Sequence, residues 1–293
     1  MKILLFLFPI CSVFHFSYAN NLEDYYHLIQ KAENKIIENE LDSSSYYYAE
    51  AFQKREYPFA KHLFNAAVVN AKIKKFKLVY PALKKLMELG AGFESLHSNI
   101  AFAGFFRSSE GKRFQNAQQS FKPVYNYEYR EKLKQLFERD QCFRVLPNAY
   151  TQYADTIRKT DQQNIYDFLN LIKKYGFPSE MIVGIAEEGF QTGVYYPLLI
   201  IHQENGPHQQ FNFAEILKEN ILNGNLENEF GNDLINLSNG TQPFNIMKVM
   251  YVKVLDEKRN PSRPDNYLAL DSTGWGYFPL TDAEWEKINA SRR

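Results

Sequence analysis

Helical periodicity in the first third of the chain constrains the fold more than any other feature. Apolar residues recur there at steps of three and four, as they do on one face of an α-helix. Between Leu22 and Ile36 this face also contains Tyr25, Ile29 and Ala32. Similar segments continue to residue 108, with Asp42 and the serines at 43–45 expected to cap the second helix. The pattern predicts a series of helices that pack against one another.

Helix pairs of this length, with alanines at the crossings, are typical of an α-solenoid. After a glycine that fits a helix end, the chain carries three spaced phenylalanines, in the order Leu89-Gly90, Phe102, Phe105 and Phe114. On these residues the region resembles the degenerate tetratricopeptide-like regions of exported bacterial proteins. The resemblance implies a tetratricopeptide-like helical repeat over residues 20–120. A plain helical bundle is the alternative.

The second half of the chain is also predicted to be mostly helical. Amphipathic segments occur at Glu128–Phe143, Gln162–Tyr175, Phe211–Leu222 and Glu229–Leu237. The apolar run Val194–Ile201 fits a buried strand or a buried helix, and its helical neighbours favour a helix.

The pattern changes after residue 240. Met247–Leu255 alternates as a strand does, and Tyr267–Leu270 is the expected return strand. A Gly-rich turn surrounds Trp275, and Thr281 is expected to cap a last helix. We therefore predict a mainly α fold: an N-terminal α-solenoid followed by a mostly helical domain, residues 125–293, with a small C-terminal β-hairpin.

The N-terminus has the form of a secretory signal peptide over residues 1–19. Lys2 precedes an apolar stretch that ends at Phe16, and small residues stand at the −3 and −1 positions of a cut after Ala19. The apolar stretch is shorter than the ~20 residues of a membrane span. We expect export to the periplasm or the exterior, with no membrane span after cleavage.

Charge and cysteine content argue against nucleic-acid binding and against an intrachain disulfide. Removing residues 1–19 takes away Lys2 and leaves 33 basic and 34 acidic residues, a net charge of −1. This balance argues against a nucleic-acid partner. Cys142 is then the only cysteine, so no intrachain disulfide forms. We expect it to be buried and inert, since reactive cysteines are less common than buried ones.

No common catalytic signature occurs in the sequence. Gly-x-Gly-x-x-Gly, phosphate-loop, Gly-x-Ser-x-Gly and His-Glu-x-x-His patterns are all missing. His202 and His208 are not spaced as in a known zinc motif, and Glu187-Glu188 fits a solvated face. The other histidines of the mature chain are expected at the surface or at the core edge: His27, His62 and His97. We predict no metal and no cofactor.

One polar set stands out in the second half. A helix ends Asp140-x-x-x-Arg144, a later helix runs into Gly176-x-Pro178, and the apolar run ends at His202-Gln203. With Gly184, and with Asp233 and Gly240-Thr241-Gln242 further on, residues 129–242 resemble an uncharacterised bacterial domain family of unknown function. The resemblance implies no activity, but it implies that Asp140, Arg144 and His202 lie together.

These residues allow two interpretations. A carboxylate beside His202 would orient its ring, with Arg144 holding an anionic ligand group and Gln141, Gln203 and Asp233 as candidate ligand contacts. Alternatively, Asp140, Arg144 and His202 form a buried network that fixes helices together.

We expect an interaction or accessory protein of the cell envelope that offers its helical repeat to a protein or peptide. A hydrolase or a small-ligand binding protein centred on His202, Asp140 and Arg144 is the alternative.

Overall fold

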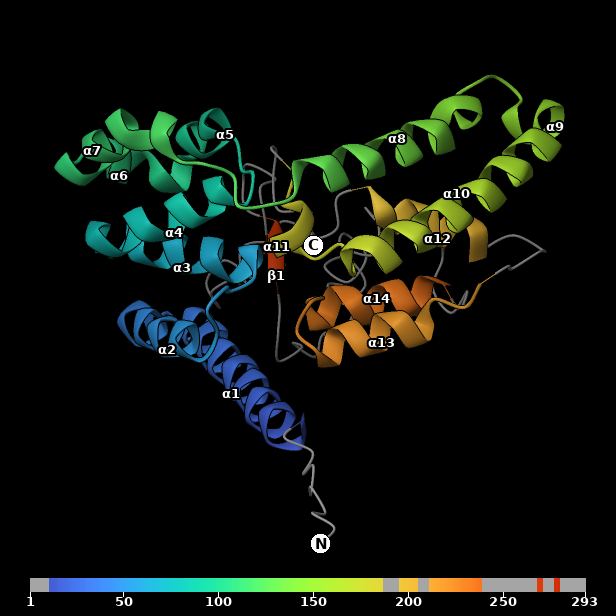
Figure 1. Cartoon of the computed structure of the whole chain (residues 1–293). Helices are drawn as coiled ribbons and strands as arrows, with labels where there is room; N and C mark the ends of the chain where they lie inside the picture. The colour runs from blue at the N-terminus through green and yellow to red at the C-terminus, as the bar shows by residue number, and fades with distance from the viewer. Residues whose placement is uncertain (1–10, 187–194, 205–210, 239–267, 271–276, 280–293) are drawn as a thin grey trace, which may run out of the picture.

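The computed structural model describes residues 11–186, 195–204, 211–238, 268–270 and 277–279. Over these residues the protein is mainly helical (Figure 1). The N-terminal half contains α1 to α7 and two short 3-10 turns at 100–102 and 118–120. The helices are α1 (Cys11–Ile37), α2 (Leu41–Lys54), α3 (Ala60–Lys72), α4 (Phe76–Glu88), α5 (Phe93–Ser98), α6 (Ala103–Phe106) and α7 (Ser109–Ala117).

The described residues of the second half add seven helices and a short strand pair. They are α8 (Tyr127–Arg144), α9 (Ala149–Gln152), α10 (Ala154–Tyr175), α11 (Glu180–Val183), α12 (Tyr196–Glu204), α13 (Ala214–Leu222), α14 (Asn228–Ser238), β1 (Leu268–Leu270) and β2 (Tyr277–Pro279). The strands are antiparallel, with Ala269 opposite Phe278. The predicted strand Met247–Leu255, the turn at Trp275 and the last helix at Thr281 lie outside the described residues.

The run that ends at His202 is helical, as its neighbours indicated, because α12 covers Tyr196–Glu204. Helix α10 ends at Gly176, which adopts a positive φ of 86° that favours glycine. This helix begins at Ala154, eight residues before the predicted start, so it carries Asp161 as an additional helical residue.

The predicted cap of the second helix is wrong. Helix α2 begins at Leu41, and Ser44 and Ser45 are buried inside it. Ser45 Oγ donates a hydrogen bond of 2.8 Å to Asn70 Oδ1 on α3. Ser45 therefore faces the neighbouring helix α3, where a small side chain permits close packing, and neither buried serine caps the helix end.

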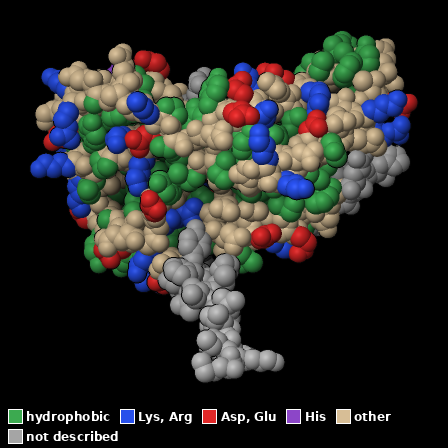
Figure 2. Space-filling model, viewed as in Figure 1, with side chains coloured by type: hydrophobic (Ala, Val, Ile, Leu, Met, Phe, Trp, Pro, Cys, Tyr) green, Lys and Arg blue, Asp and Glu red, His purple; other side chains and the backbone are tan. Residues whose placement is uncertain are grey.

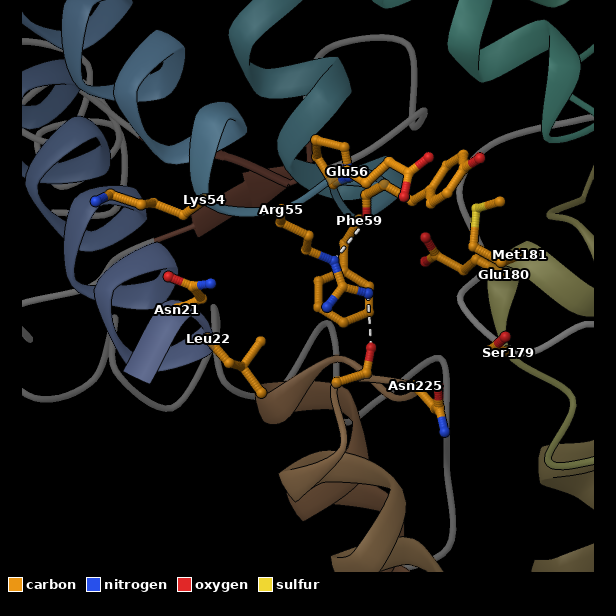
Figure 3. Close-up of a pocket in the computed structure, with 13 residues that line it drawn as sticks. Asn21, Leu22, Lys54, Arg55, Glu56, Phe59, Ser179, Glu180, Met181 and Asn225 are labelled. Carbon is orange, nitrogen blue, oxygen red and sulfur yellow. Dashed lines mark hydrogen bonds between the residues drawn. The ribbon is translucent and has the colours of Figure 1, made fainter. Parts of the chain in front are cut away.

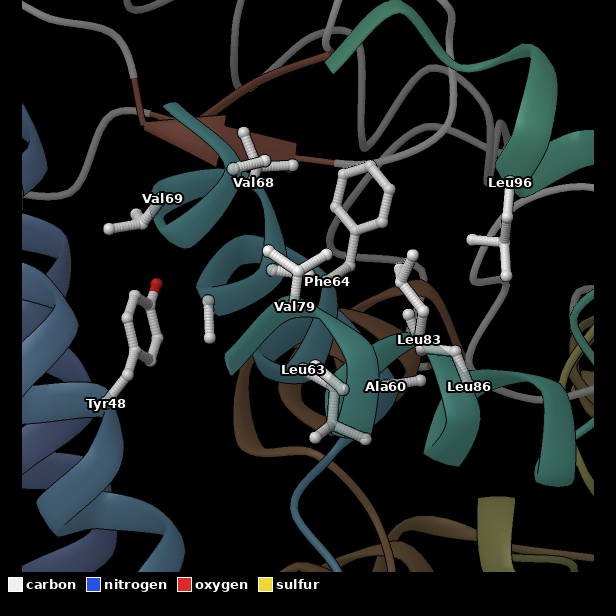
Figure 4. Packing of buried hydrophobic residues seen from close by; sticks show 14 of the residues in the cluster. Tyr48, Ala60, Leu63, Phe64, Val68, Val69, Val79, Leu83, Leu86 and Leu96 are labelled. Carbon is white, nitrogen blue, oxygen red and sulfur yellow. The ribbon is translucent and has the colours of Figure 1, made fainter. Parts of the chain in front are cut away.

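The described residues form two buried apolar clusters, one mainly from residues before 121 and the other from residues 129 onward. The first is built mainly from α1–α7, where α1 packs on α2 and α3 on α4. Figure 4 shows its centre, in which Leu63 and Phe64 of α3 face Val79 and Leu83 of α4. The second is built from α8–α14, with Phe168, Tyr196 and Phe213 completely buried. Each half of the described chain thus has an apolar interior of its own.

The segment after α11 links the two halves. Arg130 of α8 donates from Nη1 to the carbonyls of Val183 and Ile185, at 2.9 and 2.8 Å. The amide of Ile185 in turn donates to Leu89 O at the end of α4, at 2.8 Å. Among the described residues, none of the helices combines the length and the apolar character needed to cross a bilayer.

Candidate functional site

The predicted residues Asp140, Arg144 and His202 lie in contact. His202 Nδ1 on α12 is 3.0 Å from Oδ1 and 2.8 Å from Oδ2 of Asp140 on α8. One helical turn further along α8, Arg144 Nη1 donates to Asp140 Oδ1 at 3.2 Å and to its carbonyl at 2.9 Å. Only 2% of Asp140 is exposed, so its charge depends on these partners.

A fourth residue, Asp161 of α10, also belongs to this network, and it was not predicted from the sequence. Arg144 Nη2 lies 2.8 Å from both carboxylate oxygens of Asp161. Burial raises the pKa of Asp161, and the guanidinium of Arg144 opposes that rise. The guanidinium of Arg144 therefore already pairs with two carboxylates, whereas the ligand-binding interpretation required it to pair with an anionic ligand. The arrangement ties α8, α10 and α12 together, as a structural network does.

The candidate ligand contacts do not all belong to this network. Gln141 Nε2 donates to Asp140 Oδ2 at 2.6 Å. Gln203 belongs to α12, but its side chain lies outside the described residues, and Asp233 is half-buried on α14. Cys142 is exposed on α8, so the expected burial of its thiol is wrong.

The residues considered for metal binding give no site in the described part of the chain. His208, Glu187-Glu188 and Gly240-Thr241-Gln242 lie outside the described residues. Within these residues, no group of three or more histidine, cysteine or acidic side chains has an arrangement that could hold a metal ion.

An apolar groove of about 160 Å³ opens between α2, α3 and α4. Its apolar walls carry Tyr48, Phe52 and Leu63, and its rim carries Leu78, which is 44% exposed. The other lining residues are Ser45, Ala49, Ala66, Asn70, Pro81, Ala82 and Lys85. The volume is below the ~300–1,000 Å³ of small-molecule pockets, so the groove suits a few side chains of a larger partner.

The groove has a basic side chain at its edge. Lys85 lines it, and this residue is exposed on α4. Lys and Arg side chains also gather over the N-terminal helices at the left edge of Figure 2. The groove therefore combines an apolar floor with a positive rim.

A larger cavity of about 310 Å³ lies where both halves of the chain meet. Arg55 follows α2, and Figure 3 shows its guanidinium between Phe59 and the turn before Asn225. Across the space, the carboxylate of Glu180 points toward Arg55 (Figure 3). The remaining lining residues are Asn21, Leu22, Lys54, Glu56, Tyr57, Pro58, Ser179, Met181 and Gly224. This lining comes from segments far apart in the sequence.

The wall behind the cavity contains His62, whose predicted place at the surface or core edge is wrong. His62 is 2% exposed, and its Nδ1 lies 2.6 Å from the hydroxyl of Tyr25. That hydroxyl accepts the amide of Phe59 at 3.3 Å, which leaves its proton for the imidazole. Burial lowers the pKa of His62, with Lys61 and Arg55 acting in the same direction, so the ring is neutral. By contrast, His27 and His97 are exposed.

Next to His62, three carboxylates surround the buried ammonium of Lys61. Its Nζ lies 2.6 Å from Glu229 Oε2, and the charges of Glu227 and Glu33 also act on it. Burial raises the pKa of Glu33 to about 7, although Lys61 opposes the rise. Burial likewise raises the pKa of Glu227. These charges bridge α1 and α3 to the start of α14.

Comparison of the chain with protein-family models, with curated proteins and with solved structures gives no match.

Proposed function

We propose that the protein is an accessory protein of the cell envelope that binds a peptide segment of a partner in the groove between α2, α3 and α4. The groove itself carries this proposal, because it is open, apolar and too small for a whole small molecule. The exposed Lys85 favours a segment whose apolar side chains are followed or preceded by a carboxylate. Helix pairs commonly present such grooves to peptides.

The proposal includes a tetratricopeptide-like repeat in the N-terminal half. The packing of α1 on α2 and of α3 on α4 supports it, because successive helix pairs are the unit of such repeats. It also includes a C-terminal β-hairpin, which the antiparallel pairing of β1 with β2 supports. Residues 129–242 would then belong to the uncharacterised bacterial domain family that they resemble.

We also propose export through the signal peptide at residues 1–19. Helix α1 runs from Cys11 to Ile37, so cleavage after Ala19 would leave the part of this helix that carries the buried Tyr25, Ile29 and Ile36. Release of residues 20–293 to the periplasm or the exterior is the expected outcome, detected by the mass of the secreted chain. Retention of residues 1–19 would contradict it.

Peptide display on the purified protein tests the groove. We expect selected peptides to combine apolar residues with Asp or Glu. Ala49 is exposed within the groove, so Ala49→Trp should fill it without disturbing the core and weaken binding at least about tenfold, or ~1.4 kcal/mol. Lys85→Glu should weaken the same peptides and make binding less dependent on salt.

The matched control is Leu222→Glu, which changes a leucine that is 73% exposed on α13. This variant should bind the selected peptides as the unaltered protein does. If Ala49→Trp binds them equally tightly, the groove is not the binding site.

A second candidate function rests on the contact between Asp140 and His202. A carboxylate on Nδ1 orients an imidazole and stabilises its protonated form, as general bases require. On this alternative the protein is a hydrolase or a small-ligand binding protein centred on His202. A hydrolase substrate screen in which His202→Gln loses activity but keeps its melting temperature would support it. Equal activity in His202→Gln and in the unaltered protein would contradict this second function.

A further inference from the structure

The guanidinium of Arg55, which lines the larger cavity, is held in one orientation. Arg55 donates from Nε to the carbonyl of Tyr57, and from Nη2 to the carbonyl of Gly224 at 2.6 Å. The guanidinium carbon lies 4.1 Å from the centre of the Phe59 ring, a cation–π contact. Nη1 is buried, and among the described residues it has no hydrogen-bond partner. The side chain is thus oriented, with donor capacity that the described protein groups do not use.

Gly224 has a conformation that permits this approach. Its φ is +70°, and a Cβ at this position would lie 2.6 Å from Arg55 Nη1. Any larger residue would displace the guanidinium, in addition to the backbone strain. The α13–α14 turn therefore lets Arg55 lie against the backbone at the edge of the cavity.

A carboxylate stands on the other side of the same cavity. Glu180 is 6% exposed, and its Oε2 accepts the amide of Ala60 at 2.8 Å. Figure 3 shows this carboxylate pointing into the space that Arg55 faces. A carboxylate has about four acceptor positions, so one carboxylate can accept from several donors at once.

The lining as a whole balances the two signs of charge. Lys54 and Arg55 supply two cations, Glu56 and Glu180 two anions, and Ser179 adds a hydroxyl. A purely anionic or purely cationic ligand would leave one side of the cavity facing a like charge. A ligand that carries both signs satisfies both sides.

We propose that this cavity binds a small zwitterion of the α-amino acid class. Its carboxylate pairs with Arg55, and its ammonium pairs with Glu180. The volume of about 310 Å³ lies at the lower end of small-molecule sites, which fits a free amino acid or a dipeptide. This site is separate from the peptide groove, because the two share no lining residue.

Thermal unfolding of the full chain with each of the twenty free L-amino acids, and with their unblocked dipeptides, tests the proposal. We expect at least one of these to raise the melting temperature by about 2 °C or more at saturation. The N-acetyl and carboxamide forms of the same compound should give no shift, since each lacks one of the two charges.

Two variants locate the effect. Glu180→Gln keeps an acceptor for the amide of Ala60 but removes the charge, and Arg55→Met removes the guanidinium. Both should abolish the ligand-induced shift, whereas Arg158→Met, in a surface ion pair with Asp155, should preserve it.

Three results would overturn the assignment: no free amino acid or dipeptide shifts the melting temperature, a blocked form acts equally well, or the shift survives in Glu180→Gln. The blocked ligands keep the test decisive even where Arg55→Met does not fold. Peptide binding to Ala49→Trp is measured separately, so failure at one site leaves the other result intact.

Discussion

Lys61 of α3 and Glu229 of α14 form an ion pair between residues 168 positions apart, with 2.6 Å between Nζ and Oε2. The Lys61 side chain is 10% exposed, and that of Glu229 is 36% exposed. Burial alone would lower the pKa of Lys61, but the carboxylates of Glu229, Glu227 and Glu33 raise it, so the ammonium stays charged. The pair connects the N-terminal helices to α14.

Removing this ammonium should destabilise the protein strongly. In Lys61→Met, Glu33 and Glu227 lose the cation that opposes their burial. Loss of one partner from a buried charge cluster costs about 3 kcal/mol in the free energy of unfolding. Lys218→Met removes an exposed ion pair with Glu215 and should cost less than about 0.5 kcal/mol. Urea unfolding measures both, and equal losses would contradict the prediction.

Glu33 should make stability fall as the pH rises. Burial raises its pKa from 4.5 to about 7, so between these values the folded state binds a proton that the unfolded state has lost. The stabilising contribution is complete below about pH 4.5 and is lost as the pH rises through about 7.

Glu33→Gln stays neutral, so it should gain roughly 2–3 kcal/mol over the unaltered protein between about pH 5 and about pH 8. Denaturant unfolding at these two pH values measures the gain. Glu23→Gln, at an exposed position of α1, is the control and should show no such trend. A difference for Glu33→Gln that stays constant with pH would refute the assignment.

The network around Asp140 should contribute mainly to stability. Arg144→Met leaves the buried Asp140 and the partly buried Asp161 without their shared cation, and should cost about 3 kcal/mol. His202→Ala should lower the melting temperature because it removes a partner from Asp140. Cys142→Ser, on the same helix but exposed, is the matched control. Unchanged stability in Arg144→Met would favour a ligand site instead.

Two glycines in neighbouring helices should respond oppositely to alanine. A Cβ on Gly111 of α7 would lie 2.1 Å from the carbonyl oxygen of Phe105, so the backbone has to move. We expect Gly111→Ala to cost about 1–3 kcal/mol. A Cβ on Gly104 of α6 would lie 3.8 Å from Phe76, an ordinary contact.

Gly104→Ala should therefore be neutral or stabilising by up to about 1 kcal/mol, because alanine restricts the unfolded chain. Thermal unfolding of the two variants gives the comparison. A loss in Gly104→Ala as large as in Gly111→Ala would show that the close contact is not the cause.

The helices could be predicted because their signals are local. A period near 3.6 residues indicates an amphipathic helix wherever it occurs, and α8, α13 and α14 lie close to their predicted positions. The serines of α2 misled the prediction, because the same side chains that cap a helix also suit tight packing between helices. That choice depends on Asn70, which lies 25 residues away from Ser45.

The contact between Asp140 and His202 was foreseen from a resemblance, whereas the Arg55 cavity was not foreseen at all. Its lining joins the middle of α1, the α2–α3 connection, α11 and the α13–α14 turn. No spacing rule connects such segments, since their proximity results from packing. The sequence shows only a glycine, Gly224, after the predicted helix Phe211–Leu222, and its positive φ emerges from the structure.

The bridges between the two halves have a consequence for the order of events during synthesis. The hydrogen bond of Arg55 to Gly224 cannot form until a residue 169 positions later has been made, and that of the Ala60 amide to Glu180 needs a residue 120 positions later. Contacts between adjacent helices such as α1 and α2 close short loops and form sooner. A ribosome-bound chain that stops before residue 224 would therefore carry folded N-terminal helix pairs without a fixed Arg55. Protection of Arg55 from a guanidinium-specific reagent would mark the stage at which the α13–α14 turn packs against the N-terminal helices.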